Sequence, residues 1–251
     1  MALYKIADFI IDIQNRFGYI EKQCAEYKYD GDGAADLTVK VTDAELEAER
    51  KIAGDGYSPG YLESICAYRQ IAMKLPENDA LLMHGATFEL DGRGIIFIAR
   101  SGVGKSTHTF AWKRLYGDKM TVVNGDKPII RFFDGVPYAY GTPWAGKERL
   151  QTNTRARLTD ICILERGVDN KTVKVEPAEY LDQIMQQVLH PADPMAALKT
   201  LELVDGLAQK CNFWNIKCNI SDEAAIVSHD ALFGGKFDLL ALRYADMSFR
   251  A

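Results

Sequence analysis

GIIFIARSGVGKSTHTF, residues 94–110, is the stretch that decides the fold of this chain. Its apolar run, residues 95–98, predicts a buried strand. A turn rich in small residues follows over residues 99–104, and a helix is expected to begin at Lys105 and to continue past Leu115. Strand, glycine-rich turn, Lys-Ser and helix form, in this order, the sequence pattern of a phosphate-binding loop.

The residue types of this turn have a physical reason. Backbone N–H groups must converge on phosphate oxygens, and glycine leaves them uncovered. The helix N-terminus adds unpaired N–H groups and a partial positive charge. Lys105 is expected to reach the β- and γ-phosphates, and the Ser106 hydroxyl to hold Mg²⁺. The predicted nucleotide site is formed by Ser101, Gly102, Val103, Gly104, Lys105, Ser106 and Thr107.

Ala99 stands where the full pattern has glycine. Alanine is tolerated at this position if its φ is negative. The alternative interpretation of the stretch is an ordinary strand-to-helix turn that happens to contain glycine. The strand before the turn and the helix after it favour the phosphate-binding loop.

Composition and charge bound the class of protein. The 251 residues are 47% apolar, enough for a full core in one large α/β domain or in one domain with a small appendage. A net charge of −5 argues against nucleic acid as the main partner. The five cysteines include no Cys-x-x-Cys pair, so we expect a reducing compartment with neither disulfides nor a zinc site. Because no apolar stretch has membrane-spanning length, we expect a cytoplasmic protein without a membrane partner.

The order of the predicted elements suggests two parts. Residues 1–80 are expected to form an N-terminal α+β subdomain. It contains strands over residues 4–13, 19–27 and 37–41, a helix that begins at Thr42 and a second helix over residues 58–74. Residues 81–251 are expected to form the nucleotide-binding domain. No low-complexity linker separates the parts, so the subdomain should pack on the core.

A predicted hairpin shapes the second part. An Asp-Gly turn at residues 91–92 joins a strand over residues 81–90 to the strand that precedes the loop, so the two should pair antiparallel. His84 then lies at the far end of the neighbouring strand. The predicted fold class is therefore α/β with a mixed, partly antiparallel sheet. Further strands are expected from residue 121, at 129–133 and 136–140, within 158–167 and at 213–220, with helices over 176–189, 195–209 and 222–233.

Two acidic residues are candidates for chemistry. Phosphoryl transfer needs a metal ion and a group that orients or deprotonates the acceptor. Asp126 is predicted to fill this role and to bind Mg²⁺, because it ends a strand expected beside the loop. The other interpretation of Asp126 is a turn residue. Glu165 follows four apolar residues and competes as the carboxylate of a generic NTPase, or it pairs with Arg166 at a strand exit.

Basic residues supply the remaining candidates. His84 could bind the metal or assist proton transfer, although a lone histidine is more often structural. Lys147 lies in a glycine-flanked loop, and loops with a basic tip often close over phosphates. A solvated surface lysine is the alternative. Arg149, Arg155 and Arg157 follow and could add positive potential or be surface charges.

In this order, His84-Gly85, the segment Ser101 to Ser106, and Asp126 resemble the kinase domain of HPr kinase/phosphorylase and the phosphoenolpyruvate carboxykinases that share its fold. The likeness is clearest over residues 81–126 and extends loosely through the Gly-Thr-Pro-Trp-Ala-Gly-Lys stretch. It implies a mixed, partly antiparallel core and a site for ATP and Mg²⁺, and it favours functional roles for His84 and Asp126. Asp126, His84 and Lys147 are the predicted catalytic residues. A carboxykinase substrate signature is absent, so carboxykinase activity is not expected.

One departure divides the functional hypotheses. The family has two adjacent aspartates where this chain has Gly125 and Asp126. The first hypothesis is an ATP-dependent phosphotransferase, similar to HPr kinase, that phosphorylates a hydroxyl of a protein or small molecule. In it, either Asp126 suffices or a neighbour such as Asn124 or His84 compensates for the missing carboxylate. The second is a nucleotide-binding regulator with little turnover, and the third is a generic phosphate-loop NTPase that uses Glu165. The acceptor is open, and a homo-oligomer is compatible with all three hypotheses.

Overall fold

The computed structural model describes residues 2–236, and its central feature is a nine-stranded mixed sheet. Strand β10 is the branch point, because it pairs antiparallel with β9 at its start and parallel with both β6 and β12 further along. The expected mixed α/β class is therefore present. The main path runs β4 (Ala80–Leu82), β8 (Ile129–Phe133), β9 (Val136–Tyr140), β10 (Arg155–Arg166), β6 (Arg93–Ile98), β5 (Gly85–Leu90) and β7 (Thr121–Asn124), with β12 (Asn212–Cys218) on β10 and β11 (Lys171–Lys174) on β12.

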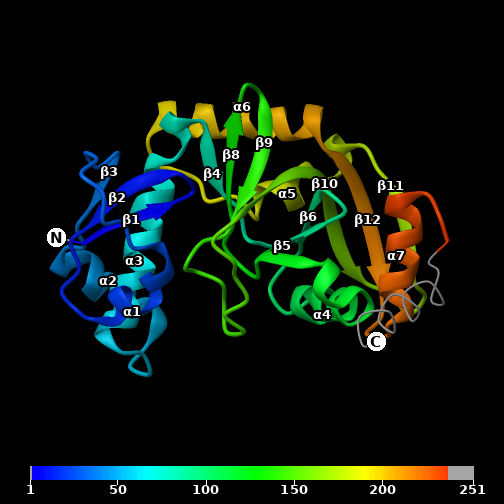
Figure 1. Ribbon diagram of the computed structural model, residues 1–251, viewed down its shortest axis with the longest axis horizontal. Helices are drawn as coiled ribbons and strands as arrows, with labels where there is room; N and C mark the ends of the chain where they lie inside the picture. Colours follow the sequence, from blue (N-terminus) through cyan, green and yellow to red (C-terminus); the bar gives the residue numbers. More distant parts are fainter. Residues whose placement is uncertain (1, 237–251) are drawn as a thin grey trace, which may run out of the picture.

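Helices cover both faces of this sheet (Figure 1). Successive residues of a strand point to opposite faces, so Ile95 and Phe97 belong to one apolar cluster and Ile96 and Ile98 to another. The first cluster includes side chains of α4 (Lys105–Tyr116) and α7 (Glu223–Phe233). The second includes side chains of α5 (Leu181–Met185) and α6 (Pro194–Lys210). The continuous apolar run of β6 is thus explained by burial on both sides.

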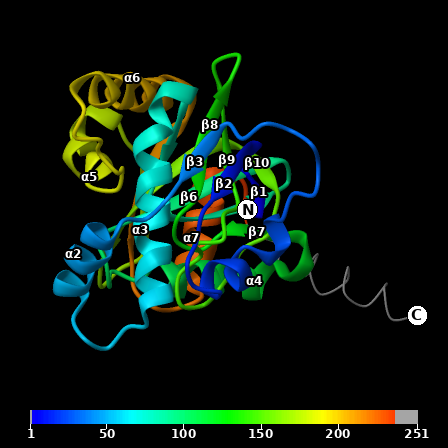
Figure 2. The same cartoon turned by 90° about the vertical axis from the view of Figure 1, so that its left-hand side faces the viewer.

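The N-terminal part has its own small sheet, which Figure 2 shows beside the long helix α3. Its strands are β1 (Ala2–Ile6), β2 (Phe9–Ile13) and β3 (Leu37–Val39), and its helices are α1 (Tyr19–Gln23), α2 (Asp43–Ala53) and α3 (Pro59–Lys74). The predicted capping box at Thr42 is confirmed, because its side chain accepts from the Glu45 N–H while the Glu45 side chain accepts from the Thr42 N–H. Short 3₁₀ helices complete the description: η1 (Ala25–Tyr27), η2 (Pro76–Asn78), η3 (Gly117–Lys119) and η4 (Pro177–Tyr180).

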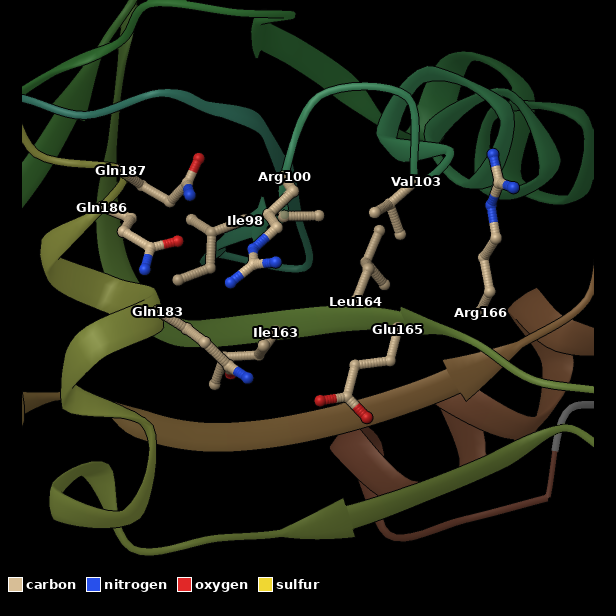
Figure 3. A pocket seen from close by; sticks show the side chains of 11 residues that line it. Ile98, Arg100, Val103, Ile163, Leu164, Glu165, Arg166, Gln183, Gln186 and Gln187 are labelled. Atoms are coloured by element: carbon tan, nitrogen blue, oxygen red, sulfur yellow. The ribbon is translucent and has the colours of Figure 1, made fainter.

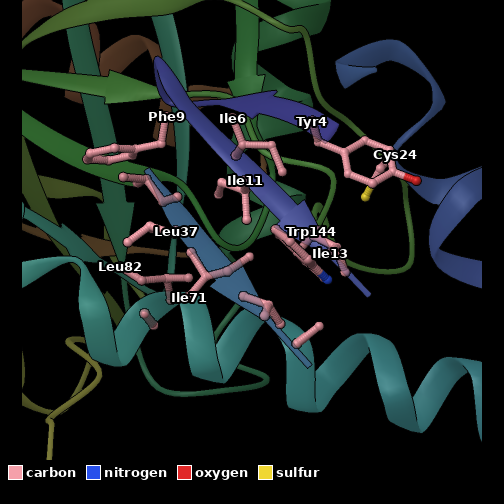
Figure 4. Packing of buried hydrophobic residues seen from close by; sticks show 14 of the residues in the cluster. Tyr4, Ile6, Phe9, Ile11, Ile13, Cys24, Leu37, Ile71, Leu82 and Trp144 are labelled. Atoms are coloured by element: carbon pink, nitrogen blue, oxygen red, sulfur yellow. The ribbon is translucent and has the colours of Figure 1, made fainter. Parts of the chain in front are cut away.

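One apolar cluster joins the N-terminal sheet to the central sheet (Figure 4). It contains Ile6, Phe9 and Ile71 from the first part together with Leu82 and Trp144 from the second. Division of the chain at residue 80 stays a prediction. Within the described residues, no helix is long and apolar enough to cross a membrane.

Two N-terminal predictions are wrong. Residues 4–13 do not form one strand, because Ala7 and Asp8 adopt φ of 52° and 60° and turn the chain into a hairpin. Aspartate tolerates a positive φ but alanine rarely does, and the pair lacks the glycine of the usual Asn-Gly or Asp-Gly hairpin signal. Residues 19–27 form α1 and η1 instead of a strand. Their buried side chains, Ile20, Cys24 and Tyr27, recur with the spacing of a helix.

The predicted Asp-Gly hairpin is confirmed, with one change. Strand β5 pairs antiparallel with β6, but residues 81–90 are divided at His84. The segment before the break, β4, pairs with β8. The expected helix over residues 176–189 is shorter and is limited to η4 and α5, and β11 was not expected. The final residues of the predicted second part, 237–251, lie outside the described residues.

Candidate nucleotide-binding site

The turn between β6 and α4 leaves its backbone open to solvent. Gly102 and Gly104 have φ of 79° and 125°, values that side chains with a Cβ rarely adopt. Gly104 is the N-cap of α4 and provides no side-chain cap. The first N–H groups of the helix therefore have no side-chain acceptor at this cap, as an anion site requires. Ala99 does not have a positive φ, which meets the condition for alanine at this position.

Lys105 folds back over this turn. Its Nζ donates a hydrogen bond to the carbonyl oxygen of Ala99 at 2.9 Å. Burial lowers the pKa of Lys105, and the negative charge of Asp126 acts in the opposite direction. The Ala99 carbonyl is the hydrogen-bond acceptor of this ammonium group within the described residues.

His84 and Asp126 lie in direct contact. His84 Nε2 is 3.1 Å from Asp126 Oδ1, and Lys127 Nζ is 3.3 Å from Asp126 Oδ2. Burial alone raises the pKa of Asp126, but the hydrogen bond with His84 and the charge of Lys127 outweigh it, so the pKa lies below its usual value. Both side chains of the His84–Asp126 pair keep more than a quarter of their surface exposed, 28% and 29%, so a ligand can reach them.

Backbone pairing places the two residues together. Gly85 pairs with Ile98 at the end of β6, which puts His84 beside the turn as predicted. The Gly85 N–H donates to the Asp126 carbonyl at 3.0 Å. Strand β7, which leads to Asp126, pairs with β5, and β5 pairs with β6, so one strand separates β7 from the strand that precedes the turn. Asp126 contacts His84, and His84 in turn lies beside the turn.

Asn124 builds the turn that carries Asp126. Its Oδ1 accepts from the Asp126 and Lys127 N–H groups at 2.8 and 2.7 Å, and its Nδ2 donates to the Thr142 carbonyl at 3.0 Å. The side chain is fully buried. It is therefore unavailable to replace the missing carboxylate at residue 125. Lys127 and Thr142 were not predicted, although asparagine before Gly-Asp is a signal for such a side-chain-supported turn.

The loop that carries Lys147 is fixed at its base and open at its tip. Trp144 Nε1 donates to Ser64 Oγ on α3 at 2.9 Å, and Gln23 Nε2 of α1 donates to the Pro143 carbonyl at 3.1 Å. Gly146 lies against Asp126, since a Cβ at this glycine would be 3.1 Å from the Asp126 Cβ. Lys147 is exposed and forms no hydrogen bond or ion pair within residues 2–236. The structure thus brings the tip of this loop beside Asp126.

Glu165 lies on the opposite side of the turn. Its strand β10 runs parallel to β6, with Ile163 paired to Ile98. The nearest ion-pair partner is Lys217, at 4.0 Å, and not Arg166 as the alternative interpretation expected. Arg166 donates instead to the Gly102 carbonyl at 2.5 Å. This contact supports the turn from β10 and was not predicted.

The three candidate arginines lie in the loop before β10 and at the start of that strand. Arg149 is exposed in the same loop tip as Lys147. Arg155 and Arg157 begin β10, whereas the turn adjoins its other end. Arg155 is 3.3 Å from Asp8 Oδ2 and donates to the Tyr140 hydroxyl at 2.8 Å. Arg155 and Arg157 were predicted either to add positive potential at the site or to be surface charges, and the structure supports surface charges.

The donor set fits a magnesium–phosphate site. Among residues 2–236 no group of three or more His, Cys, Asp or Glu side chains gathers as a metal site. Mg²⁺ is commonly held by one or two protein oxygens together with substrate phosphates and water. Ser106, in the first turn of α4, and Asp126 are the residues that would hold it.

Comparisons with known proteins add little. No protein-family model matches the sequence, and no curated protein matches it. Among solved structures, the HPr(Ser) kinase/phosphatase from Coxiella burnetii is similar at a TM-score of 0.28 and 11% identity, over 49% of this chain and 86% of that chain. A likeness at this level carries no argument about activity.

Proposed function

We propose that the chain is an ATP-dependent phosphotransferase that transfers the γ-phosphoryl group to a hydroxyl of a protein or small molecule. The observation that carries the proposal is the His84–Asp126 contact at 3.1 Å beside an open glycine turn that leads into Lys105. A phosphate cradle and a carboxylate next to it are the two parts that phosphoryl transfer requires of a protein.

Each residue has a distinct role in this proposal. The Ser101–Thr107 backbone and Lys105 bind the phosphates. Asp126 accepts the proton of the acceptor hydroxyl. The hydroxyl oxygen bonds to the γ-phosphorus, and the bond from this phosphorus to the β–γ bridging oxygen breaks, which releases ADP. His84 holds the carboxylate in place, and the tip with Lys147 lies where it can cover the phosphates. Mg²⁺, when bound by Ser106 and Asp126, neutralises charge that develops on the phosphate oxygens.

A nucleotide-binding regulator with little turnover is the second candidate, and it rests on Gly125. A Cβ at Gly125 would lie 3.2 Å from the Ala145 carbonyl oxygen and 3.4 Å from the Leu150 Cβ. The loop thus packs where a second carboxylate would begin. A site with one carboxylate and a tightly packed glycine is suited to binding without fast turnover.

Transfer of radiolabel from γ-labelled ATP to components of a lysate from the source organism separates the two candidates. For a phosphotransferase we expect labelled product with the wild-type chain and a loss of roughly 10²–10⁴-fold with Asp126→Asn, the usual contribution of a general base. Asp134→Asn, on an exposed hairpin turn, is the matched control and should keep wild-type transfer. Tight MgATP binding by all three proteins without labelled product would establish the regulator instead.

A further inference from the structure

A pocket of about 380 Å³ lies against the glycine turn and β10 (Figure 3). Strand β10 adjoins β6 on the side opposite β5 and β7, so the pocket is on the other side of the turn from Asp126. Its wall next to the turn consists of Ile98, Ala99 and Val103, and Ile163 and Leu164 come from β10. These apolar side chains are complemented by three carboxamides from α5 and the residues after it, Gln183, Gln186 and Gln187. The charged side chains of Arg100, Glu165 and Arg166 complete the lining. The volume and the mixture of an apolar surface with a few polar groups are those of a small-molecule site.

Two of the carboxamides have an atom without a partner. The Oε1 atoms of Gln183 and Gln187 are buried and accept no hydrogen bond from any residue in the described part of the chain. Gln187 as a whole is only 6% exposed. Buried polar atoms nearly always have a partner, so these two acceptors indicate a ligand that donates hydrogen bonds inside the pocket.

Gln187 also ties the pocket to the proposed site. Its backbone carbonyl accepts from the His84 N–H at 2.7 Å, so a residue that lines the pocket is joined directly to the His84–Asp126 pair. A nucleotide is a linear molecule with the γ-phosphate at one end and the base at the other. If the γ-phosphate faces Asp126, the nucleoside leaves the turn on the other side, where the pocket begins.

We propose that this pocket binds the adenine base of the nucleotide, and that the carboxamides of Gln183 and Gln187 recognise its 6-amino group. This inference rests on the proposed function, because it uses the direction of the triphosphate. A glutamine side chain can accept from the adenine amino group while it donates to a ring nitrogen, whereas guanine is more often paired with arginine or lysine. The apolar residues fit the faces of the ring, and the planar guanidinium of Arg100, which also lines the pocket, can stack on it.

Calorimetric titration of the magnesium complexes of four compounds tests the assignment. They are ATP, GTP, purine riboside triphosphate, which lacks only the amino group of ATP, and inorganic tripolyphosphate, which lacks the nucleoside. We expect ATP to bind at least tenfold more tightly than the other three. In Gln187→Met and Gln183→Met, ATP should lose roughly 2–10-fold in affinity, the equivalent of one ordinary hydrogen bond, while tripolyphosphate binds as before.

Gln209→Met, at an exposed position of α6 outside the pocket, is the matched control. Gln183 is only half-buried, so its variant tests the pocket even where Gln187→Met unfolds. If tripolyphosphate binds, and if ATP and purine riboside triphosphate bind with equal affinity, the adenine pocket is overturned and the phosphate site remains. Loss of phosphoryl transfer in the variants with unchanged ATP affinity would overturn it as well and assign the pocket to the acceptor. Failure of both ATP and tripolyphosphate to bind would overturn the proposed function itself.

Discussion

Asp126 illustrates how single residues are prepared by their neighbours. Its two oxygens contact His84 and Lys127, and its backbone is held by Asn124. The hydrogen bond and the positive charge outweigh burial and lower its pKa. The carboxylate is consequently ionised near neutral pH, as required of a metal ligand and of a general base.

Lys105 provides the first prediction at this scale. Lys105→Ala removes a charged contact to the β- and γ-phosphates, and a hydrogen bond to a charged group contributes about 1.5–3 kcal/mol. We expect MgATP affinity to fall roughly ten- to a hundredfold with the fold retained. Calorimetry and circular dichroism measure the two effects, and Lys119→Ala, at an exposed lysine just beyond α4, is the matched control. Equal affinity in wild type and Lys105→Ala would show that the turn is no phosphate-binding loop.

Gly125 provides the second. Its φ is not positive, so a side chain is compatible with the backbone, but the contacts with Ala145 and Leu150 are tight. If the site is a slow phosphotransferase, Gly125→Asp restores a second carboxylate and should raise the rate of label transfer by tenfold or more, within the range that general-base catalysis supplies. Gly125→Ala introduces the same crowding without the charge and should not raise the rate. A rate increase in both variants would trace the effect to packing.

At the scale of elements, helix α4, which follows the glycine turn, contains a buried histidine. His108 Nε2 accepts from Trp112 Nε1 at 3.3 Å and lies 3.2 Å from Ser228 Oγ on α7. Burial lowers the pKa of His108 from 6.5 to about 4. His108 thus belongs to the buried contact between α4 and α7.

This histidine gives a prediction about pH. Above pH 6.5 the imidazole is neutral in both the folded and the unfolded chain. Between pH 6.5 and 4 only the unfolded chain takes up the proton, so the free energy of unfolding falls as the pH falls, by about 3 kcal/mol at most. In His108→Gln this part of the decrease should be absent. Urea unfolding at several pH values measures it, with His190→Gln at an exposed position as control. An identical pH dependence in wild type and His108→Gln would contradict the assignment.

The sequence predicted the elements that have local signals. The apolar run of β6, the Asp-Gly turn before it and the capping box of α2 are encoded within a few residues, and all three were found. The hairpin at Ala7-Asp8 and the break at His84 depend on packing against β8 and β9, far away in the chain, and were missed. Tertiary contacts override local preference in such places.

In the candidate site, too, residues with a local signal could be predicted from the sequence. The glycine turn and Lys105 belong to a motif, and His84 and Asp126 each stand at the end of a predicted strand. The supporting residues could not be predicted. Arg166 reaches Gly102 from β10, and Gln187 reaches His84 from the segment after α5, with no pattern in the sequence to indicate either contact.

At the scale of the whole molecule, the N-terminal part adjoins the site. Trp144, in the loop that ends beside Asp126, belongs to the apolar cluster of the N-terminal sheet and donates to Ser64 of α3. Arg131 of β8 donates to the Ala7 carbonyl at 2.9 Å and lies over the Phe9 ring at 3.8 Å. These contacts connect the two parts, so the position of the loop tip depends on both.

The most direct measurement of the central claim is a crystal structure with Mg²⁺ and a non-hydrolysable ATP analogue. We expect the triphosphate along residues 101–107, the metal ion bound by Ser106 and Asp126, and the γ-phosphate on the side of His84. A structure with Glu165 beside the γ-phosphate and Asp126 turned to solvent would contradict the proposed phosphotransferase and favour a generic NTPase.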